Sequence, residues 1–198
     1  MLLADKNQTL TDFQHQTLEI REKELNYFVA LYNGISGIAA MMAGFGFGSL
    51  KIEFPDSTSY MLQIAYLTIT ASAIGLELLA ILNAATCSVF GPGKFLRGKD
   101  GLASANQAVS VLEEKSEITL QYFLMGFGCI IISSSLKAFI LHSFFNALIV
   151  SCGLLAVSFY LLTVGQRIID RLYVEKKQAI SGLIQGDQVI DPTDAKLQ

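Results

Sequence analysis

The residues of this chain most able to do chemistry are three carboxylates, those of Glu53, Asp56 and Glu77, each beside or inside a long apolar run. Glu77 lies near the middle of its run, where a carboxylate costs about 2.5–3.5 kcal/mol even on the mildest insertion scale. Four residues share its helical face: Thr70, Ala73, Ala80 and Ala84. This spacing predicts that Glu77 points at another helix and not at lipid. Two roles stay open: an interhelical hydrogen bond to Asn33, Asn146 or a serine, or a cation- or proton-linked function.

Glu53 and Asp56 stand in a short polar segment between the first two apolar runs, together with Pro55 and Lys51. A ring of carboxylates at a pore mouth attracts cations, so these two residues are the candidate ion-pathway acids. The alternative is ordinary loop charge exposed to solvent. Lys51 favours this alternative because its positive charge would partly cancel the field of the acids.

Residues that could form an enzyme site or hold a metal are not arranged to do so. Cys87, Cys129 and Cys152 lie inside apolar runs, are odd in number and form no CxxC pair, so neither a disulfide framework nor a metal site is expected. His15 and His142 are far apart, and no Ser/His/Asp or Cys/His spacing occurs. We therefore expect no enzyme and no cofactor. The net charge of −3 also argues against nucleic-acid binding.

The composition indicates a membrane protein, because 52% of the residues are hydrophobic and only 16% are charged. Soluble domains carry about 25% charged residues. Four apolar runs are long enough, or nearly so, for the roughly 20 residues of a spanning helix. They cover residues 27–50, 60–90, 118–136 and 139–164. The predicted fold is all-α, an integral membrane bundle of four transmembrane helices with cytoplasmic helical extensions.

The segments between the runs predict how the helices connect. Residues 91–117 form a long charged connection, within which Ser104 or Asn106 could cap a helix that continues into the third span. Residues 133–143 form a very short connection, so the third and fourth spans should pair as an antiparallel hairpin. The predicted parts are an N-terminal segment (1–25), a membrane domain (26–180) and a disordered tail (181–198).

Lysine and arginine counts predict the orientation. The N-terminal segment, the segment 91–117 and the tail hold most of the basic residues, whereas the two other connections hold one each, Lys51 and Lys137. The positive-inside rule therefore places both termini in the cytoplasm of a multi-pass protein, in the plasma membrane or an endomembrane. Lys94, Arg97 and Lys99 could also bind anionic lipid headgroups, although charges that only set topology are the simpler interpretation.

The first span carries a stripe of small or polar residues at helical spacing: Asn33, Gly37, Ala40, Gly44 and Gly48. Small faces let helix backbones approach closely in lipid, which favours helix packing as the role of this stripe. The functional alternative is a helix beside a symmetry axis, with thin side chains around a pathway.

Several strings resemble the Orai family of calcium-channel subunits over about residues 25–180. Residues 36–48, SGIAAMMAGFGFG, look like the pore helix of that family, with Ala43-Gly44-Phe45 as the matching segment. Residues 85–87, Ala-Thr-Cys, followed by Pro92, resemble the end of the family's second helix. A charged helix leading into the third span and a fourth span that continues as an amphipathic helix also fit the family.

The resemblance implies a homo-oligomer, a hexamer if the family pattern holds, in which the first helices line a pore for Ca²⁺. It implies an outer glutamate ring, a hydrophobic gate and a basic inner section. These family positions fall on Ile52, Gly48 and Gly37, with Glu53 one residue late. Met41 and Phe45, with Gly48, are then the candidate constriction.

The predicted function is an Orai-like cation channel subunit with Ca²⁺ as the candidate permeant ion, surrounded by membrane lipids and with no cytoplasmic regulator identified. The alternative is a non-conducting multi-pass scaffold or assembly subunit with the same fold, which the residues Gly48 and Ile52 favour. A small transporter ranks third, because no duplicated halves are visible.

Overall fold

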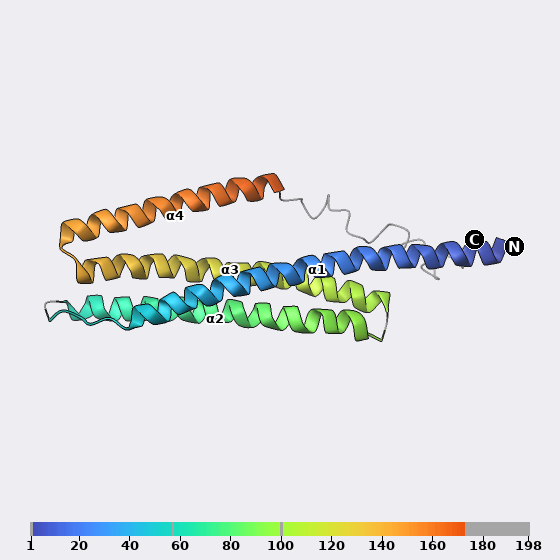
Figure 1. The fold of residues 1–198 in the computed structure, drawn as a ribbon, viewed down its shortest axis with the longest axis horizontal. Helices are drawn as coiled ribbons and strands as arrows, with labels where there is room; N and C mark the ends of the chain where they lie inside the picture. Colours follow the sequence, from blue (N-terminus) through green and yellow to red (C-terminus); the bar gives the residue numbers. More distant parts are fainter. Residues whose placement is uncertain (1, 57, 100, 173–198) are drawn as a thin grey trace, which may run out of the picture.

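The computed structural model describes residues 2–56, 58–99 and 101–172, and this part of the chain folds into four long helices (Figure 1). Their bounds are α1 Leu2–Leu50, α2 Tyr60–Arg97, α3 Leu102–Leu141 and α4 Phe144–Leu172. Each contains a stretch long and apolar enough to cross a membrane: His15–Leu50, Tyr60–Arg97, Leu102–Leu141 and Phe144–Ile168. The protein is therefore an all-α, four-helix multi-pass membrane bundle, as predicted.

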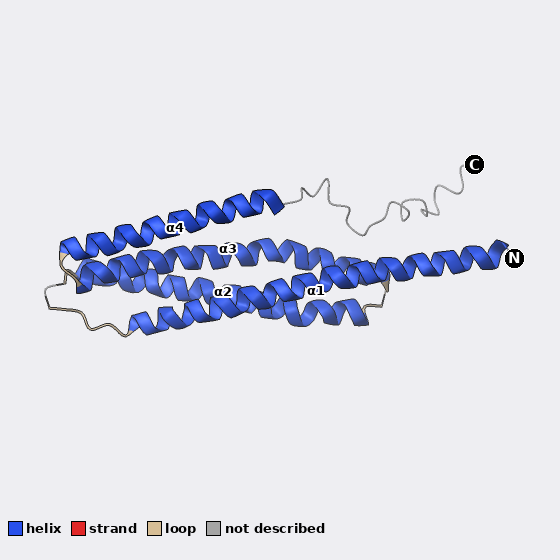
Figure 2. Cartoon of the chain, turned by 45° about the horizontal axis from the view of Figure 1, so that its top comes forward, coloured by secondary structure: helices blue, strands red, loops and turns tan. Residues whose placement is uncertain are grey.

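The helices differ in how many neighbours they have. α1, α2 and α3 pack against one another in all three pairings, whereas α4 packs only against α3 within the described chain. Figure 1 and Figure 2 show α4 on the outer side of α3, away from α1 and α2. The order across the bundle is thus α1 with α2, then α3, then α4.

The two ends of the bundle differ in charge. The connection between α1 and α2 holds Glu53 and Asp56 and defines what we call the acidic end. The connection between α2 and α3 lies at the opposite end with Lys94, Arg97 and Lys99, which we call the basic end (Figure 1). The N-terminal end of α1 extends past the basic end (Figure 1).

One face of α1 packs into the bundle. Its buried residues from Leu25 onward lie three, four or seven positions apart: Leu25, Tyr32, Ile35, Ala39, Ala43 and Gly46. This spacing resembles the seam of a coiled coil and allows long, nearly parallel contact with α2 and α3. At the basic end, Leu25 and Tyr32 join Ala84, Val109 and Leu112 in one buried cluster.

Three hydrogen bonds tie the helices together, two of them buried and one partly buried. The Tyr32 hydroxyl donates to the Leu112 carbonyl at 2.6 Å, which joins α1 to α3. The Tyr66 hydroxyl donates to the Ser49 carbonyl at 2.6 Å, which joins α2 to α1. The hydroxyls of Thr70 and Ser133 lie 2.5 Å apart and join α2 to α3. A polar group in lipid is costly unless it is paired, so these bonds fix the helices in register.

The connection between α2 and α3 is much shorter than predicted. The sequence predicted a connection from residue 91 to a helix start at Ser104 or Asn106, but α2 continues through Pro92 to Arg97 and α3 begins at Leu102. Proline removes one helical hydrogen bond, but packing can offset that cost. Gly91 allows this packing, because a Cβ added there would lie 2.9 Å from Leu112 Cδ1.

The start of α3 also differs from the prediction in its cap. Gly101, with φ at 52°, is the N-cap residue, and no side chain caps the helix. Ser104 and Asn106 lie inside α3, so the prediction that either would cap it was wrong. Glycine adopts a positive φ without steric strain, so the chain can reverse direction at Gly101 within a few residues. α3 therefore begins earlier than predicted. The predicted helical extension ahead of the third span is confirmed.

The hairpin of α3 and α4 is confirmed, with a shorter turn than expected. α3 runs to Leu141 and α4 starts at Phe144, so Ser133 and Phe139 belong to α3. α1 runs without interruption through the boundary proposed at residues 25 and 26. The tail predicted at 181–198 lies outside the described residues.

Candidate functional site

The face of α1 opposite the buried seam meets no other helix of the described chain. Met41 is 60% exposed and Phe45 is 65% exposed. A Cβ added to Gly37, Gly44 or Gly48 would meet nothing within 4 Å. The other members of the predicted small stripe, Asn33 and Ala40, are exposed as well. None of the four described helices therefore packs on this stripe within one chain.

The glycines of the segment 44–48 face two different ways. Gly46 is buried against α2, where an added Cβ would lie 2.6 Å from Ile74 Cγ1. Gly44 and Gly48 lie on the free face instead. Gly46 was not assigned to either face from the sequence. The heptad spacing of the buried residues from Leu25 onward is the signal that would have identified it.

The acids of the acidic end are exposed on a connection that aromatic contacts anchor. Phe54 packs edge-on against the ring of Tyr66, with ring centroids 6.1 Å apart. A turn follows, in which the Thr58 amide donates to the Pro55 carbonyl at 2.9 Å. The connection leaves three charged residues at the surface: Lys51, Glu53 and Asp56. Carboxylates held on an anchored loop could raise the local concentration of cations.

Glu77 lies in the interior of the bundle with 0% of its surface exposed. Thr70, Ala73, Ala80 and Ala84 are buried on the same face, which confirms that Glu77 points at another helix. Its predicted amide partners are wrong, since Asn33 and Asn146 are both exposed. Neither carboxyl oxygen has a hydrogen-bond partner among the described residues.

Gly126 of α3 makes room for Glu77. A Cβ added to Gly126 would lie 2.8 Å from Glu77 Oε1 and 2.9 Å from its Cδ. Ser133, a buried serine of α3, bonds Thr70 of α2 instead. Gly126 was not singled out from the sequence. A search for small residues on the third span that could face a buried acid would have found it.

No metal site is visible in the described part of the chain, where no group of three or more His, Cys, Asp or Glu residues comes together. Cys87, Cys129 and Cys152 all have free thiols. His15 and His142 are exposed on α1 and at the end of α3, respectively.

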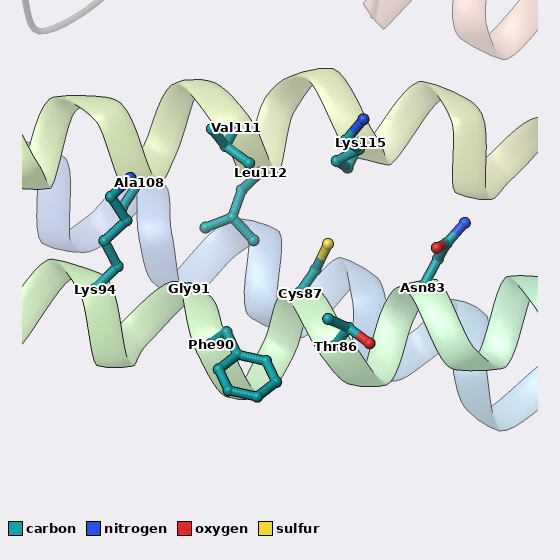
Figure 3. Close-up of a pocket in the computed structure, with 10 residues that line it drawn as sticks. All are labelled: Asn83, Thr86, Cys87, Phe90, Gly91, Lys94, Ala108, Val111, Leu112 and Lys115. Atoms are coloured by element: carbon teal, nitrogen blue, oxygen red, sulfur yellow. The ribbon is translucent and has the colours of Figure 1, made fainter.

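The basic residues of the basic end divide into two groups. Lys94, Arg97 and Lys99 are all exposed, but only Lys94 lines a groove of about 300 Å³ between α2 and α3. Lys115 of α3 lines the same groove (Figure 3). Lys115 was given no site role from the sequence, because it lies on α3 while the other three lie on or just after α2.

Comparisons with protein-family models, with curated proteins and with solved structures find no match to this chain. The resemblance to the Orai family therefore depends on the residues quoted for it alone.

Proposed function

We propose that this protein is a subunit of a homo-oligomeric cation channel in which the free face of α1 lines the pathway. The observation that carries the proposal is the two-faced packing of α1. One face is buried against α2 and α3, and the opposite face is rich in glycine and has no partner within the described residues. Lipid does not favour bare glycine over other apolar residues, but close contact between helices does. Copies of α1 around a common axis would supply that contact.

The order of the helices is consistent with a ring. With α1 at the centre, α2 and α3 would form a surrounding layer, and α4, which packs only on α3 within the described chain, would lie at the periphery. The Orai resemblance likewise implies that the first helices line the centre.

The side chains on the free face suggest the parts of a pathway. Met41 and Phe45 are the large apolar residues there and would narrow the centre, with Gly48 one turn closer to the acidic end. Glu53 and Asp56 would concentrate cations, with Ca²⁺ as the candidate ion, at the acidic end. By the distribution of basic residues, this end faces away from the cytoplasm.

In this proposal Glu77 would contribute to assembly of the oligomer or to coupling between helices, because it lies between α2 and α3 and not on the free face of α1. A Glu77→Gln variant that assembles and conducts normally would remove any role for an ionised carboxylate there.

The second candidate is a non-conducting scaffold or assembly subunit of the same fold. The specific observation in its favour is that the free face of α1 holds no carboxylate between Gly37 and Gly48, while Lys51 stands beside the acids. Such a protein would assemble through the same glycine face and stay silent in flux measurements.

Two measurements test the proposal. In a background with all three native cysteines replaced by alanine, Met41→Cys should form disulfide-linked dimers in membranes on mild oxidation, because Met41 is on the free face and cysteine adds no bulk there. Phe159→Cys is the control, because it is exposed on the peripheral helix α4. Equal cross-linking of the two variants, or none in Met41→Cys, would contradict a central α1.

The second measurement is flux into vesicles that contain the purified protein and a calcium dye. We expect uptake by the wild type that Glu53→Gln reduces. Glu22→Gln, an equal loss of charge on an exposed part of α1, should leave uptake unchanged. Cross-linking of Met41→Cys with no wild-type uptake at any voltage or pH would support the scaffold instead.

A further inference from the structure

The groove between α2 and α3 at the basic end has the features of a lipid site. It encloses about 300 Å³, and its walls include the apolar side chains of Phe90, Val111 and Leu112. Phe90 is 70% exposed and Val111 is 43% exposed, although they lie near charged residues. Apolar walls at this level remain exposed unless a ligand with an apolar part covers them.

The charge of the groove is positive. Lys94 stands at one end of the row of lining residues and Lys115 stands toward the other end, next to Asn83, with Phe90 and Cys87 between the two lysines (Figure 3). Among the described residues that line the groove, none is acidic. Lys94 forms no ion pair in the described chain, and Lys115 makes an exposed 3.5 Å contact with Glu114. An ion pair exposed to solvent contributes little free energy, so Glu114 does not hold the Lys115 ammonium group strongly. The ammonium groups of Lys94 and Lys115 are therefore both available to bind an anion.

A neutral donor lies at the same place. Asn83 lines the groove, and its amide can donate to phosphate or ester oxygens. Thr86 lines it too, but its hydroxyl already donates to the Leu82 carbonyl at 2.7 Å. The hydrogen-bond donors left to a ligand are therefore Asn83 and the two lysines.

The position of the groove identifies the ligand. Phe90 is the last residue of the second apolar run, and Lys115 stands just ahead of the third run, which begins at Ile118. The groove therefore lies where the apolar belt ends, at the level of the lipid headgroups. The amphiphiles present there are the phospholipids of the surrounding leaflet.

We propose that this groove binds one anionic phospholipid. The phosphate would lie between Lys94 and Lys115, and the glycerol would lie against Phe90 and Val111. The ester oxygens would lie near Asn83, and the acyl carbons would continue toward the middle of the bilayer. Lys94 would hold the outer, negatively charged part of the headgroup. The proposal does not depend on ion conduction, since the groove lies on α2 and α3 within a single chain.

Native mass spectrometry of the purified full chain in detergent tests this site. The probes are phosphatidylserine and phosphatidylcholine with identical acyl chains, each titrated against the protein. We expect one tightly bound phosphatidylserine. Affinity should fall about five-fold in Lys94→Gln or Lys115→Gln and about thirty-fold in the double variant, as expected for loss of one cation each near an anionic lipid. Phosphatidylcholine should bind weakly to all of them.

The matched control is the double variant Arg97→Gln/Lys99→Gln, which removes the same charge from the same end without touching the groove. It should lower phosphatidylserine affinity less than two-fold. An equal loss in this control would overturn the proposal in favour of diffuse attraction. Val111→Trp, which fills the groove and leaves both lysines, should abolish tight binding, and retained binding would also overturn it.

Soluble competitors separate a lipid from a free anion or a peptide. Glycerol 3-phosphate and inorganic phosphate at millimolar concentration should displace little phosphatidylserine, because they lack the apolar part. Full displacement by either would show a phosphate site and contradict the lipid assignment. Displacement by an acidic amphipathic peptide at concentrations below those of the lipid would contradict it as well, in favour of a protein partner.

Discussion

The carboxyl group of Glu77 on α2 packs directly against Gly126 on α3, in a place where a single added carbon would come within 2.8 Å of Oε1. The pair is buried, and the acid finds no hydrogen-bond partner among the described residues. A glycine is therefore needed opposite the acid, and α2 and α3 are held at a spacing that depends on both residues.

Gly126→Ala should destabilise the protein through this contact. Overpacking of a filled interior costs about 1–3 kcal/mol, and the higher helix propensity of alanine offsets up to about 1 kcal/mol. We expect the free energy of unfolding, measured by SDS titration in mixed micelles, to fall by about 1–2 kcal/mol. In a Glu77→Ala background the same change should be neutral or stabilising, because the space is then open. A double-mutant cycle with no coupling between the two sites would refute the contact.

Tyr32→Phe should cost stability by removing the hydrogen bond to the Leu112 carbonyl. The hydroxyl is buried and the ring stays in place, so the loss should be about 0.5–1.5 kcal/mol. Tyr27→Phe is the control on the same helix, since Tyr27 is 63% exposed, and its unfolding free energy should not change. Equal effects of the two variants would mean that the 2.6 Å bond contributes nothing.

The fold could be predicted from the sequence because the physics of the bilayer restricts the options. Four apolar runs and the need to satisfy backbone groups in lipid leave helices as the solution for this composition. The face of Glu77 was also predictable, since Thr70, Ala73 and Ala84 follow helical spacing around it. The point at which α2 ends could not be predicted from the sequence. A segment with Gly91, Pro92 and Gly93 has the composition of a turn, and only packing against Leu112 shows why it stays helical.

The site was less predictable, because a glycine in the sequence does not indicate whether its side of the helix is open or packed against a neighbour. Gly44 and Gly46 are two residues apart, but one is open to the outside and the other touches Ile74. The groove was hidden for a different reason. Lys94 and Lys115 lie on different helices and come to one groove only through the tight turn near Gly101. The sequence taken one segment at a time therefore does not predict that Lys94 and Lys115 line the same groove.

The hydrogen bond between Thr70 and Ser133 should contribute modestly. Double-mutant cycles for such bonds in membranes average about 0.6 kcal/mol and reach about 1.7 kcal/mol. The pair is buried with its hydroxyls 2.5 Å apart, so we expect a coupling of about 1 kcal/mol between Thr70→Val and Ser133→Ala. Ser72→Ala is a control on the same helix, because the Ser72 hydroxyl is exposed and bonds only its own helix at Thr68. Coupling between Ser72 and Ser133 as large as that of the pair would indicate a general effect on α2.

Gly44→Ala and Gly46→Ala should have opposite effects, although each adds one methyl group to α1. At Gly46 the new carbon would meet Ile74 Cγ1 at 2.6 Å, and a β-branched side chain has few rotamers with which to move away. α1 must then shift from α2, so the unfolding free energy of the single chain should fall by about 1–2 kcal/mol. At Gly44 nothing lies within 4 Å, so alanine should leave the chain as stable or raise its stability by up to about 1 kcal/mol.

Assembly should respond in the reverse order if copies of α1 meet through the free face. Gly44→Ala should then lower the fraction of oligomer, because the added methyl group separates helices that approach through glycine. Size-exclusion chromatography with light scattering gives that fraction for each variant at equal protein and detergent concentrations. Gly46→Ala should keep the oligomer at temperatures below its own unfolding, because Gly46 faces α2 of the same chain. An unchanged oligomer in Gly44→Ala, or a wild type that is monomeric, would mean that the glycine face of α1 meets lipid and not another copy.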